Sequence, residues 1–508
     1  MPVKQAKPSL LYRVGKGVIL ALSLTTLLAV TLYLVLRYGY MHMSISESLE
    51  FRVPSLAMYA TALLLSVALY LLRPVLKRIP EKALFWGLLG CYLAAGVALI
   101  LCTDPTPRTD QYQVLSIAAH LKNGDFSDFE PDRYLMAYPH QLGLAVYEML
   151  LMHISDSPRF LQFVNLAWVL LTLWLLWQTS RLLRSDDLER KYSLVFLFAF
   201  LPQLFFVLML YGEVPGAMLV ALSLYWACLG WKKRRWGWWL GSCIALGLAC
   251  LIRNNFLIAA IALVILALLL ALKERQWRAL LLALGMAVCA VGAPKAVNAI
   301  YMDKAGVDPG QQGIPKISFV TMGLQTNNTG KVDGWYNGYN QRIWRDYGYD
   351  GDAVAEQAVL DLEKRLKEMA ENPAETFAFF RRKATSMWCD PLFESLWSGP
   401  LEDYGQYTYG KLAQNLYQGG KAYTALYTLM YAVVLLSYAM VLLEGVRSRG
   451  GNPWMLFGLL YFLGAFLFHL VWEASGQYVC VNLPFLMPMA GWGFARASRW
   501  VAARAERR

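Results

Sequence analysis

Long apolar runs separated by short polar stretches dominate this chain. About twelve of the runs have roughly 17 to 25 residues, the length that a helix needs to cross a bilayer. Their approximate bounds are Gly17–Arg37, Ser55–Leu72, Ala83–Leu101, Phe160–Leu183, Tyr192–Tyr211, Val214–Trp231, Gly237–Ile252, Phe256–Leu272, Ala279–Ile300, Thr424–Leu443, Trp454–Val471 and Val479–Phe494. The pattern predicts an all-α polytopic membrane protein with about 12 transmembrane helices.

Two long segments of polar character interrupt these runs. One extends from Cys102 to about Pro158, and the other from Tyr301 to about Tyr423. The chain is therefore expected to have five parts: N-terminal transmembrane helices (1–102), a first outer catalytic loop (103–158), a transmembrane core (159–300), a large outer loop (301–423), and C-terminal transmembrane helices with a basic tail (424–508).

Both long polar segments contain patterns that suit helices at a membrane interface. Apolar residues recur at helical spacing in Gln111–Leu121, and Tyr138–Ile154 is apolar but too short to span comfortably. In the second segment, Ile314–Asn340 predicts an ordered loop, whereas Asp352–Glu371 and Ala374–Met387 predict amphipathic helices. Juxtamembrane helices are therefore expected beside the transmembrane bundle.

The net charge of +12 is distributed in a way that indicates membrane topology instead of nucleic-acid binding. Basic residues cluster at alternate helix ends, in Lys4–Lys16, Arg73–Lys82, Arg181–Lys191, Lys232–Arg235, Lys273–Arg278, Arg447–Arg449 and Arg496–Arg508. Basic loops face the cytoplasm, so both termini are predicted to be cytoplasmic and both long segments extracytoplasmic. The predicted location is the plasma membrane, with the active site on its outer side.

Composition narrows the chemistry further. The chain is 57% hydrophobic and 16% charged, whereas a soluble protein has about 25% charged residues. Most of the eight cysteines lie in apolar segments and none forms a C-x-x-C pair, so redox chemistry and a thiolate metal site are not expected. Five scattered histidines give no metal-ligand spacing. No cofactor is expected, and a carboxylate-bound divalent cation is the alternative.

Candidate chemistry begins with two aspartates, Asp104 and Asp110, which lie just after the apolar run that ends near Leu101. Carboxylates where a helix leaves the bilayer are functional candidates. Six sequence motifs lie in outer segments or at helix ends that are predicted to face the outside. They occur in this order: Asp104–Tyr112, Tyr138–Gly143, Tyr211–Pro215, Met322–Leu324 with Gly334–Gly338, Glu394–Pro400, and Glu473–Tyr478.

This ordered set resembles bacterial membrane glycosyltransferases of the C superfamily, relatives of the family 39 protein O-mannosyltransferases and of the lipid A aminoarabinose transferase. The resemblance extends from about Ala83 to Arg496. It implies the fold of that superfamily and a donor in which a sugar is linked to a polyprenyl phosphate. It also implies transfer to an extracytoplasmic glycan, lipid or protein acceptor, by direct inverting displacement.

The resemblance further implies that an aspartate of the first outer loop is the general base. A positioned carboxylate can take the proton of an acceptor hydroxyl as that hydroxyl attacks the anomeric carbon. We favour Asp110 over Asp104, and both stay candidates. An acidic residue at Glu213 is implied to orient the first-loop carboxylate or the acceptor.

The leaving phosphate already carries charge and needs cations instead of an acid. Arg253 follows an apolar run on the predicted outer side, where basic residues are scarce, so it is expected to have a partner such as phosphate. Interfacial snorkelling is the alternative. The same argument applies to Lys295, near the outer end of another run.

Five further positions complete the predicted substrate site. Glu473 and Tyr478 match a motif in which an acidic residue precedes Arg-Tyr, but Gln477 replaces the arginine, which shifts phosphate binding to Arg253 or Lys295. His140 is a candidate acceptor-site residue. Trp335 and Tyr336 are aromatic residues that could stack on sugar faces, with an interfacial aromatic belt as the alternative.

Two other functions compete with sugar transfer. A transporter or lipid flippase also has many helices, but it usually carries charges at mid-membrane depth and paired broken helices. Here the apolar runs are nearly free of charge, and polar residues concentrate at outer helix ends. A catalytically degenerate accessory subunit is the third alternative, because Gln477 departs from the motif.

Overall fold

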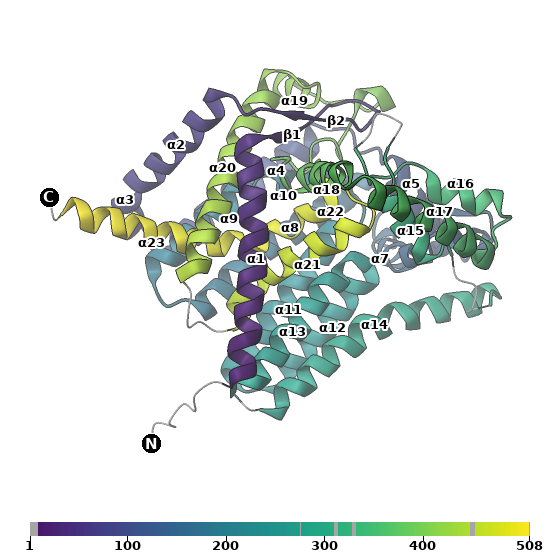
Figure 1. Ribbon diagram of the computed structural model, residues 1–508, viewed down its shortest axis with the longest axis horizontal. Coiled ribbons are helices and arrows are strands. Elements are labelled where there is room, and N and C mark those ends of the chain that lie inside the picture. The colour runs from purple at the N-terminus through teal and green to yellow at the C-terminus, as the bar shows by residue number, and fades with distance from the viewer. Residues whose placement is uncertain (1–8, 275, 309–312, 328–331, 448–452, 507–508) are drawn as a thin grey trace.

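The computed structural model describes residues 9–274, 276–308, 313–327, 332–447 and 453–506 (Figure 1). Six residues of the basic clusters lie outside these ranges: Lys4, Lys7, Arg275, Arg449, Arg507 and Arg508. Within the described ranges, nine helices are long and apolar enough to cross a membrane, or up to eleven if each of two bent pairs forms one span. One shorter apolar helix adds to them. The predicted all-α polytopic architecture is confirmed.

The candidate spans coincide with the apolar runs of the sequence. The continuous ones are α1 (Leu10–Leu36), α2 with α3 (Leu56–Leu71 and Arg73–Arg78), α4 (Glu81–Leu101), α8 (Pro158–Leu183), α11 (Glu213–Lys233), η4 with α13 (Asn254–Phe256 and Leu257–Glu274), α14 (Trp277–Ala305), α20 (Lys421–Arg447), and η6 with α21 (Pro453–Leu456 and Phe457–Val471). The shorter apolar helix is α12 (Trp236–Ile252). A helix suits lipid because its backbone polar groups bond within the segment.

Two spans are broken, and both breaks adjoin predicted motifs. The first joins α9 (Asp187–Ala199) to α10 (Pro202–Phe205) and η3 (Phe206–Leu208), and the second joins α22 (Gly476–Cys480) and η7 (Leu483–Phe485) to α23 (Met487–Ala505). The bends are 49° and 52°. Proline lacks an N–H donor and ends or kinks a helix, and Pro202, Pro484 and Pro488 lie at these breaks.

The remaining elements lie in the loops that join the spans. A short antiparallel hairpin comprises β1 (Tyr38–Met41) and β2 (Leu49–Arg52). The first long segment forms α5 (Thr109–Lys122), η1 (Ser127–Phe129), α6 (Tyr134–Ala137), η2 (Pro139–Gln141) and α7 (Leu142–Met152). The second forms α15 (Lys316–Gly323), α16 (Tyr339–Asp346), α17 (Gly351–Glu371), α18 (Pro373–Trp388), η5 (Glu402–Tyr404) and α19 (Lys411–Tyr417).

Direct contacts join the hairpin and both long segments at one end of the bundle, which we name the loop end. Thr103 pairs with Thr408 in a β-bridge. Trp397 donates its indole N–H to the Ser44 carbonyl at 2.8 Å, and the Ile314 amide donates to the Ala137 carbonyl at 3.0 Å. Figure 1 shows α1 leading up into β1, with α5 and α15 to α18 gathered at the right.

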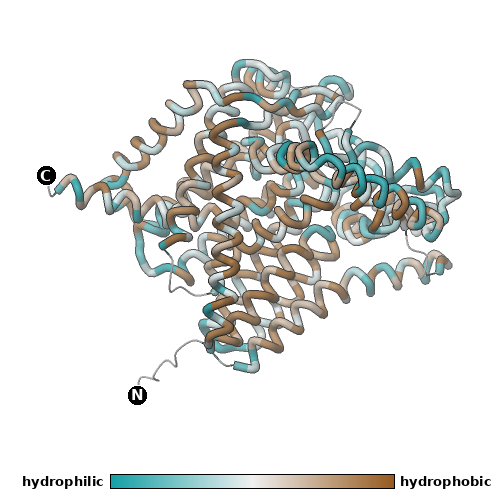
Figure 2. Tube along the Cα trace, viewed as in Figure 1, coloured by the Kyte–Doolittle hydropathy of each residue, from teal (hydrophilic) through white to brown (hydrophobic). Residues whose placement is uncertain are grey.

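Hydropathy follows this division. Figure 2 shows apolar residues through the middle of the bundle. Hydrophilic residues lie on α16 and α17 and at the short loops of the opposite side (Figure 2). At that opposite side, which we name the basic end, Arg184 contacts Glu444 and Arg190 contacts Glu81. The segments that the basic clusters placed on one side of the membrane therefore do meet one another.

One predicted loop is partly wrong. Ile314–Asn340 was expected to lack helix, but it contains α15 and the start of α16. Helix α15 buries Met322 against Val354 and Ala358 of α17, so tertiary packing stabilises a helix in a stretch rich in glycine and asparagine. The short hairpin at residues 38–52 is a further element that the apolar pattern does not predict.

Candidate active site

Asp110 lies in the first turn of α5, at the loop end. Its Oδ2 accepts a hydrogen bond from the Tyr211 hydroxyl at 3.1 Å. Tyr211 in turn accepts from the Gln141 side-chain amide, and its hydroxyl lies 3.3 Å from that of Tyr134. The cap position of α5 is occupied by Arg108, so the Asp110 carboxylate is committed to a tyrosine cluster instead of to helix capping.

The surroundings of Asp110 combine access with low polarity. The residue itself is exposed, yet the protein around it displaces most of the bulk water. This desolvation raises the pKa of Asp110 above its usual range, while the Tyr211 hydrogen bond and the Arg253 charge oppose the rise. A carboxylate that is reachable and has a raised pKa is a better proton acceptor near neutral pH than one in open water.

Asp104 has a different, local role. Its Oδ1 accepts from the Thr106 amide at 3.0 Å and from the Thr106 hydroxyl at 2.7 Å, which is the geometry of an Asx turn. Its own amide donates to the Tyr407 carbonyl at 2.8 Å. Asp104 therefore holds the entry of the first long segment against the second one.

Glu213 and Arg253 form an ion pair next to the tyrosine cluster, with 2.7 Å between the Arg253 Nη2 and the Glu213 Oε1. Glu213 is 1% exposed and starts α11 directly after Gly212, whose φ of 87° favours glycine. Arg253 also donates to the Tyr211 carbonyl at 2.9 Å. Its guanidinium lies 4.4 Å from the Tyr211 ring centre and 5.6 Å from that of Tyr478. The partner that sequence reasoning required for Arg253 is thus, within the protein, a carboxylate.

Glu473 lies in the loop before α22, and Tyr478 lies within α22. The Tyr478 hydroxyl donates to Glu473 Oε1 at 2.9 Å. Burial raises the pKa of Glu473 to about 7, the Tyr478 hydrogen bond opposes this, and the charge of Asp110 adds to the rise. Because these two carboxyl groups influence each other, Asp110, Arg253, Glu473 and Tyr478 belong to one cluster.

His140 and Tyr336 lie at the edge of the same cluster. Burial lowers the pKa of His140 to about 4, and the positive charges of Arg253 and Lys316 lower it further, so the imidazole is neutral at pH 7. Burial raises the pKa of Tyr336 to about 12, with the charges of Asp110 and Glu473 contributing. Both side chains are half-buried and can offer neutral hydrogen-bonding groups.

Two predicted site residues are not brought to this cluster. Trp335 is 1% exposed and donates its indole N–H to the Ser386 hydroxyl at 2.9 Å, so the expectation that it stacks on a sugar face is corrected: it belongs to the core. Lys295 is exposed on α14. Among the described residues, no hydrogen bond or ion pair joins it to the other predicted site residues.

Several residues of the cluster escaped sequence reasoning. Tyr134, Tyr138 and Tyr211 surround Asp110. Tyr138 and Tyr211 begin two of the sequence motifs, but neither was among the expected site residues. Glu47, at the tip of the hairpin, contributes negative charge that acts on Glu473 and Tyr336. No sequence pattern indicated it, because contacts across more than four hundred residues bring it there.

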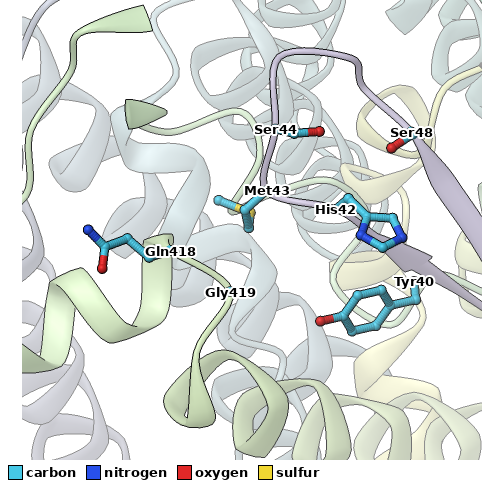
Figure 3. A pocket seen from close by; sticks show the side chains of 7 residues that line it. All are labelled: Tyr40, His42, Met43, Ser44, Ser48, Gln418 and Gly419. Carbon is cyan, nitrogen blue, oxygen red and sulfur yellow. The ribbon is translucent and has the colours of Figure 1, made fainter. Parts of the chain in front are cut away.

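A separate pocket lies away from this cluster. An open pocket of about 410 Å³ is lined by Tyr40, His42, Met43, Ser44, Ser48, Gln418 and Gly419, and shares no lining residue with the cluster (Figure 3). A small, mostly apolar cavity of about 30 Å³ has Glu213 in its wall, between the two broken spans. We place the chemistry at the cluster, because charge, access and raised pKa coincide there and not in the larger pocket.

In the described part of the chain, no group of three or more His, Cys, Asp or Glu side chains could hold a metal ion. The cluster instead offers two accessible or half-buried carboxyl groups, one arginine, and the hydroxyls of several tyrosines. Such a set can take a proton, hold polar hydroxyl groups and balance an anion, which are the requirements of group transfer to a hydroxyl.

Residues 149–297 match the family model of the dolichyl-phosphate-mannose-protein mannosyltransferases. The match confirms over this range the resemblance that the ordered motifs indicate, and it supports a membrane glycosyltransferase. No curated protein matches the chain. Among solved structures, the chain is similar to the apo crystal structure of ArnT from Cupriavidus metallidurans, with 15% identity over 80% of this chain and 77% of that one. The TM-score of 0.33 is too low to align individual residues.

Proposed function

We propose that this chain, a relative of the protein mannosyltransferases over its central part, moves a sugar from a polyprenyl-phosphate donor to an acceptor hydroxyl outside the cytoplasm. The acceptor is a cell-envelope glycan, lipid or protein. The observation that carries the proposal is the accessible Asp110 carboxylate with a raised pKa, bonded to Tyr211 beside Arg253.

Asp110 is the base of this reaction. It takes the proton of the acceptor hydroxyl while the oxygen attacks the anomeric carbon, and the bond from that carbon to the phosphate oxygen breaks. Attack opposite the leaving phosphate inverts the anomeric centre. Asp104 is the weaker candidate, because its carboxylate already accepts two bonds from Thr106.

Arg253 balances the charge of the leaving phosphate. Glu213 holds its guanidinium from one side, and the Tyr211 and Tyr478 rings confine it, so it is preorganised toward the cluster. Glu473 and Tyr478, with His140 and Tyr336, surround the sugar and the acceptor with polar groups. Neither a metal nor a cofactor takes part in this scheme.

One observation favours the rival transporter function. Two broken spans meet beside the cluster, and broken helices are typical of transport sites. In transporters such breaks bind ions or substrate at mid-membrane depth. Here they support the loops that carry Tyr211 and Glu473, and the family match adds weight to sugar transfer.

Transfer itself is the first test. Purified protein in liposomes is incubated with polyprenyl-phosphate sugars labelled in the sugar, together with envelope extract as a mixed acceptor. Acceptor-dependent release of polyprenyl phosphate supports the proposal. Labelled donor that crosses the bilayer without losing its sugar supports a flippase. If neither transfer nor crossing occurs with any donor, the accessory-subunit alternative is supported.

The proposed orientation has a separate test. Asn123 follows α5 at the loop end and is exposed, whereas Lys233 ends α11 at the basic end and is exposed. With the wild type as background, Asn123→Cys should react with an impermeant thiol reagent added outside intact cells, and Lys233→Cys should not. The reverse labelling would contradict an extracytoplasmic active site.

A further inference from the structure

The segment that carries Glu473 is held by groups that play no part in the proposed chemistry. Lys383 of α18 is 0% exposed. Its ammonium group donates to the carbonyls of Leu470 at 3.1 Å and Trp472 at 2.7 Å, and also to that of Gly323. A buried ammonium group with carbonyl acceptors fixes the backbone that supplies them, because leaving either partner unbonded is costly.

A second group holds the other side of Glu473. Glu394 is 1% exposed, its Oε2 accepts from the Ser475 hydroxyl at 2.8 Å, and its Oε1 accepts from the Gly476 amide. Between these two anchors, the Ala474 amide donates to the Gly334 carbonyl at 3.0 Å. The Glu473 carbonyl lies 2.8 Å from the His469 Nδ1, so every position from Trp472 to Gly476 is tied by its backbone or side chain.

The glycines of two motifs make this arrangement possible. A Cβ on Gly323 would lie 2.7 Å from the Trp472 carbonyl oxygen. A Cβ on Gly334 would lie 2.6 Å from both the Gly323 oxygen and the Lys383 Cε, and Gly334 has φ of 73°. Only glycine at these two positions allows the segments around residues 323, 334 and 472 and the Lys383 side chain to approach so closely.

Glu394 is itself fixed by a neighbour. Asp390 accepts from the Glu394 amide at 2.8 Å and from the Tyr427 hydroxyl of α20 at 2.6 Å. Phe393 and Glu394 both have positive φ, 49° and 58°, a conformation that costs energy and persists only where surrounding bonds impose it. The strained backbone of the loop at 389–400 thus places the Glu394 carboxyl group within hydrogen-bond distance of residues 475 and 476.

We infer that Lys383 and Glu394 are positioning residues that clamp segment 472–476 from both sides, so that Glu473 and Tyr478 face Asp110 and Arg253. The inference rests on the proposed function for its kinetic test. It gives a physical role to the motifs around Gly323, Gly334 and Glu394, which sequence analysis noted without one. An offset of about 1 Å at a catalytic group can lower turnover roughly a hundredfold.

The decisive variants differ only in hydrogen bonding. Glu394→Ala removes both bonds, and turnover should fall about 10- to 100-fold with little change in donor KM. Glu394→Gln keeps an acceptor for Gly476 and can donate to Ser475, so it should restore at least a third of turnover. Equal loss in both variants would overturn positioning by these bonds.

A double-mutant cycle separates positioning from general folding. A clamp that acts through Glu473 has nothing left to position when that group is removed. Glu394→Ala should therefore add little loss in a Glu473→Gln background, and the same holds for Lys383→Met. Full additivity would show that the residues act independently of Glu473. Arg382→Met, next to Lys383 but paired with Asp333 and Glu375 near the surface, is the matched control and should retain turnover.

Alkylation of Cys480 tests the positioning role of Lys383 and Glu394 without an activity assay, and therefore independently of the proposed function. Cys480 is 1% exposed and lies four residues after Gly476. Loss of the clamp should make its alkylation at least several-fold faster by peptide-resolved mass spectrometry, relative to Cys228 as internal standard. If wild type transfers no sugar but Cys480 responds, the proposed function fails and the clamp stands. If Cys480 alkylation is unchanged in Glu394→Ala and Lys383→Met, the clamp is wrong.

Discussion

The two ends of the bundle hold their carboxylates with different partners. At the basic end, Glu444 is 0% exposed and lies between Arg184 and Arg496, at 2.5 and 3.0 Å. At the loop end, Asp110 and Glu473 take their hydrogen bonds from Tyr211 and Tyr478. Arginine supplies an opposite charge to a carboxylate, whereas a phenol hydroxyl supplies only a hydrogen bond.

This difference separates charge that supports the fold from charge that is kept for chemistry. At the basic end, Glu81 also pairs with Arg190 and Glu189 with Arg499. At the loop end, the Arg253 guanidinium beside the cluster is engaged by Glu213. Burial raises the pKa of Asp110 and of Glu473, and the charge of Arg253 opposes the rise only in part. Raised pKa values of this kind are typical of functional groups.

The largest expected effect lies at the loop end. Asp110→Asn keeps the bond from Tyr211 but cannot accept a proton, so turnover should fall by roughly 10²- to 10⁴-fold. Donor binding and thermal stability should barely change. The measurement is sugar release under donor saturation, with Asp104→Asn as the matched control, since its carboxylate only closes a turn.

The pH dependence sharpens the same prediction. The base must be ionised, so kcat/KM should decline as pH falls through the raised pKa of Asp110. If Asp104→Asn alone abolishes transfer, the base is Asp104. If neither variant loses activity, no first-loop carboxylate is the base.

The sequence predicted the spans well and the site only in part. Ten of the twelve apolar runs form one largely continuous helix each and two form broken spans, because a helix bonds its backbone within the segment when it lies in lipid. Asp110, Glu213, Arg253, Glu473 and Tyr478 came together as motif order suggested. The sugar-stacking role predicted for Trp335 was wrong, because the sequence of a polar loop does not show whether a tryptophan side chain is exposed or buried. Glu47 and Glu394 were missed as site residues, since only long-range packing reveals what they face.

The second effect tests the basic end. Glu444→Gln leaves Arg184 and Arg496 without their shared counter-charge, and breaking a buried pair costs about 3–5 kcal/mol when fully desolvated. Because both arginines are partly exposed, a loss of roughly 2–3 kcal/mol in unfolding free energy is expected. Turnover of the folded protein should be unchanged. Glu274→Gln, in a more exposed pair with Arg234, should cost under about 1 kcal/mol.

The third effect concerns Arg253, whose guanidinium lies in the cluster at the loop end. Arg253→Ala should weaken donor binding about 10- to 100-fold, since a charged hydrogen bond contributes roughly 1.5–3 kcal/mol. Arg253→Lys should lose less. Because Arg253→Ala also strands buried Glu213, the variant is repeated in a Glu213→Gln background and donor affinity is measured by equilibrium binding. Near-normal affinity in all variants would confine Arg253 to its internal ion pair.

The smallest effect compares the two ends through pH. The pKa of folded Glu473 is about 7 and that of the unfolded chain about 4.3, so between these values the folded state binds more protons. Wild-type stability should therefore fall as pH rises through this window and level off above about 7. Glu473→Gln cannot ionise and escapes that loss, so relative to wild type it should gain about 1–2 kcal/mol between pH 5 and pH 8. The value allows for the half-buried position of Glu473, and thermal unfolding at both pH values measures it. Glu444→Gln should be destabilised at both, because its carboxylate is neutralised by arginine throughout. If Glu473→Gln gains nothing at pH 8 over pH 5, Glu473 ionises as freely as in water, and the two ends do not differ in the way their charges are held.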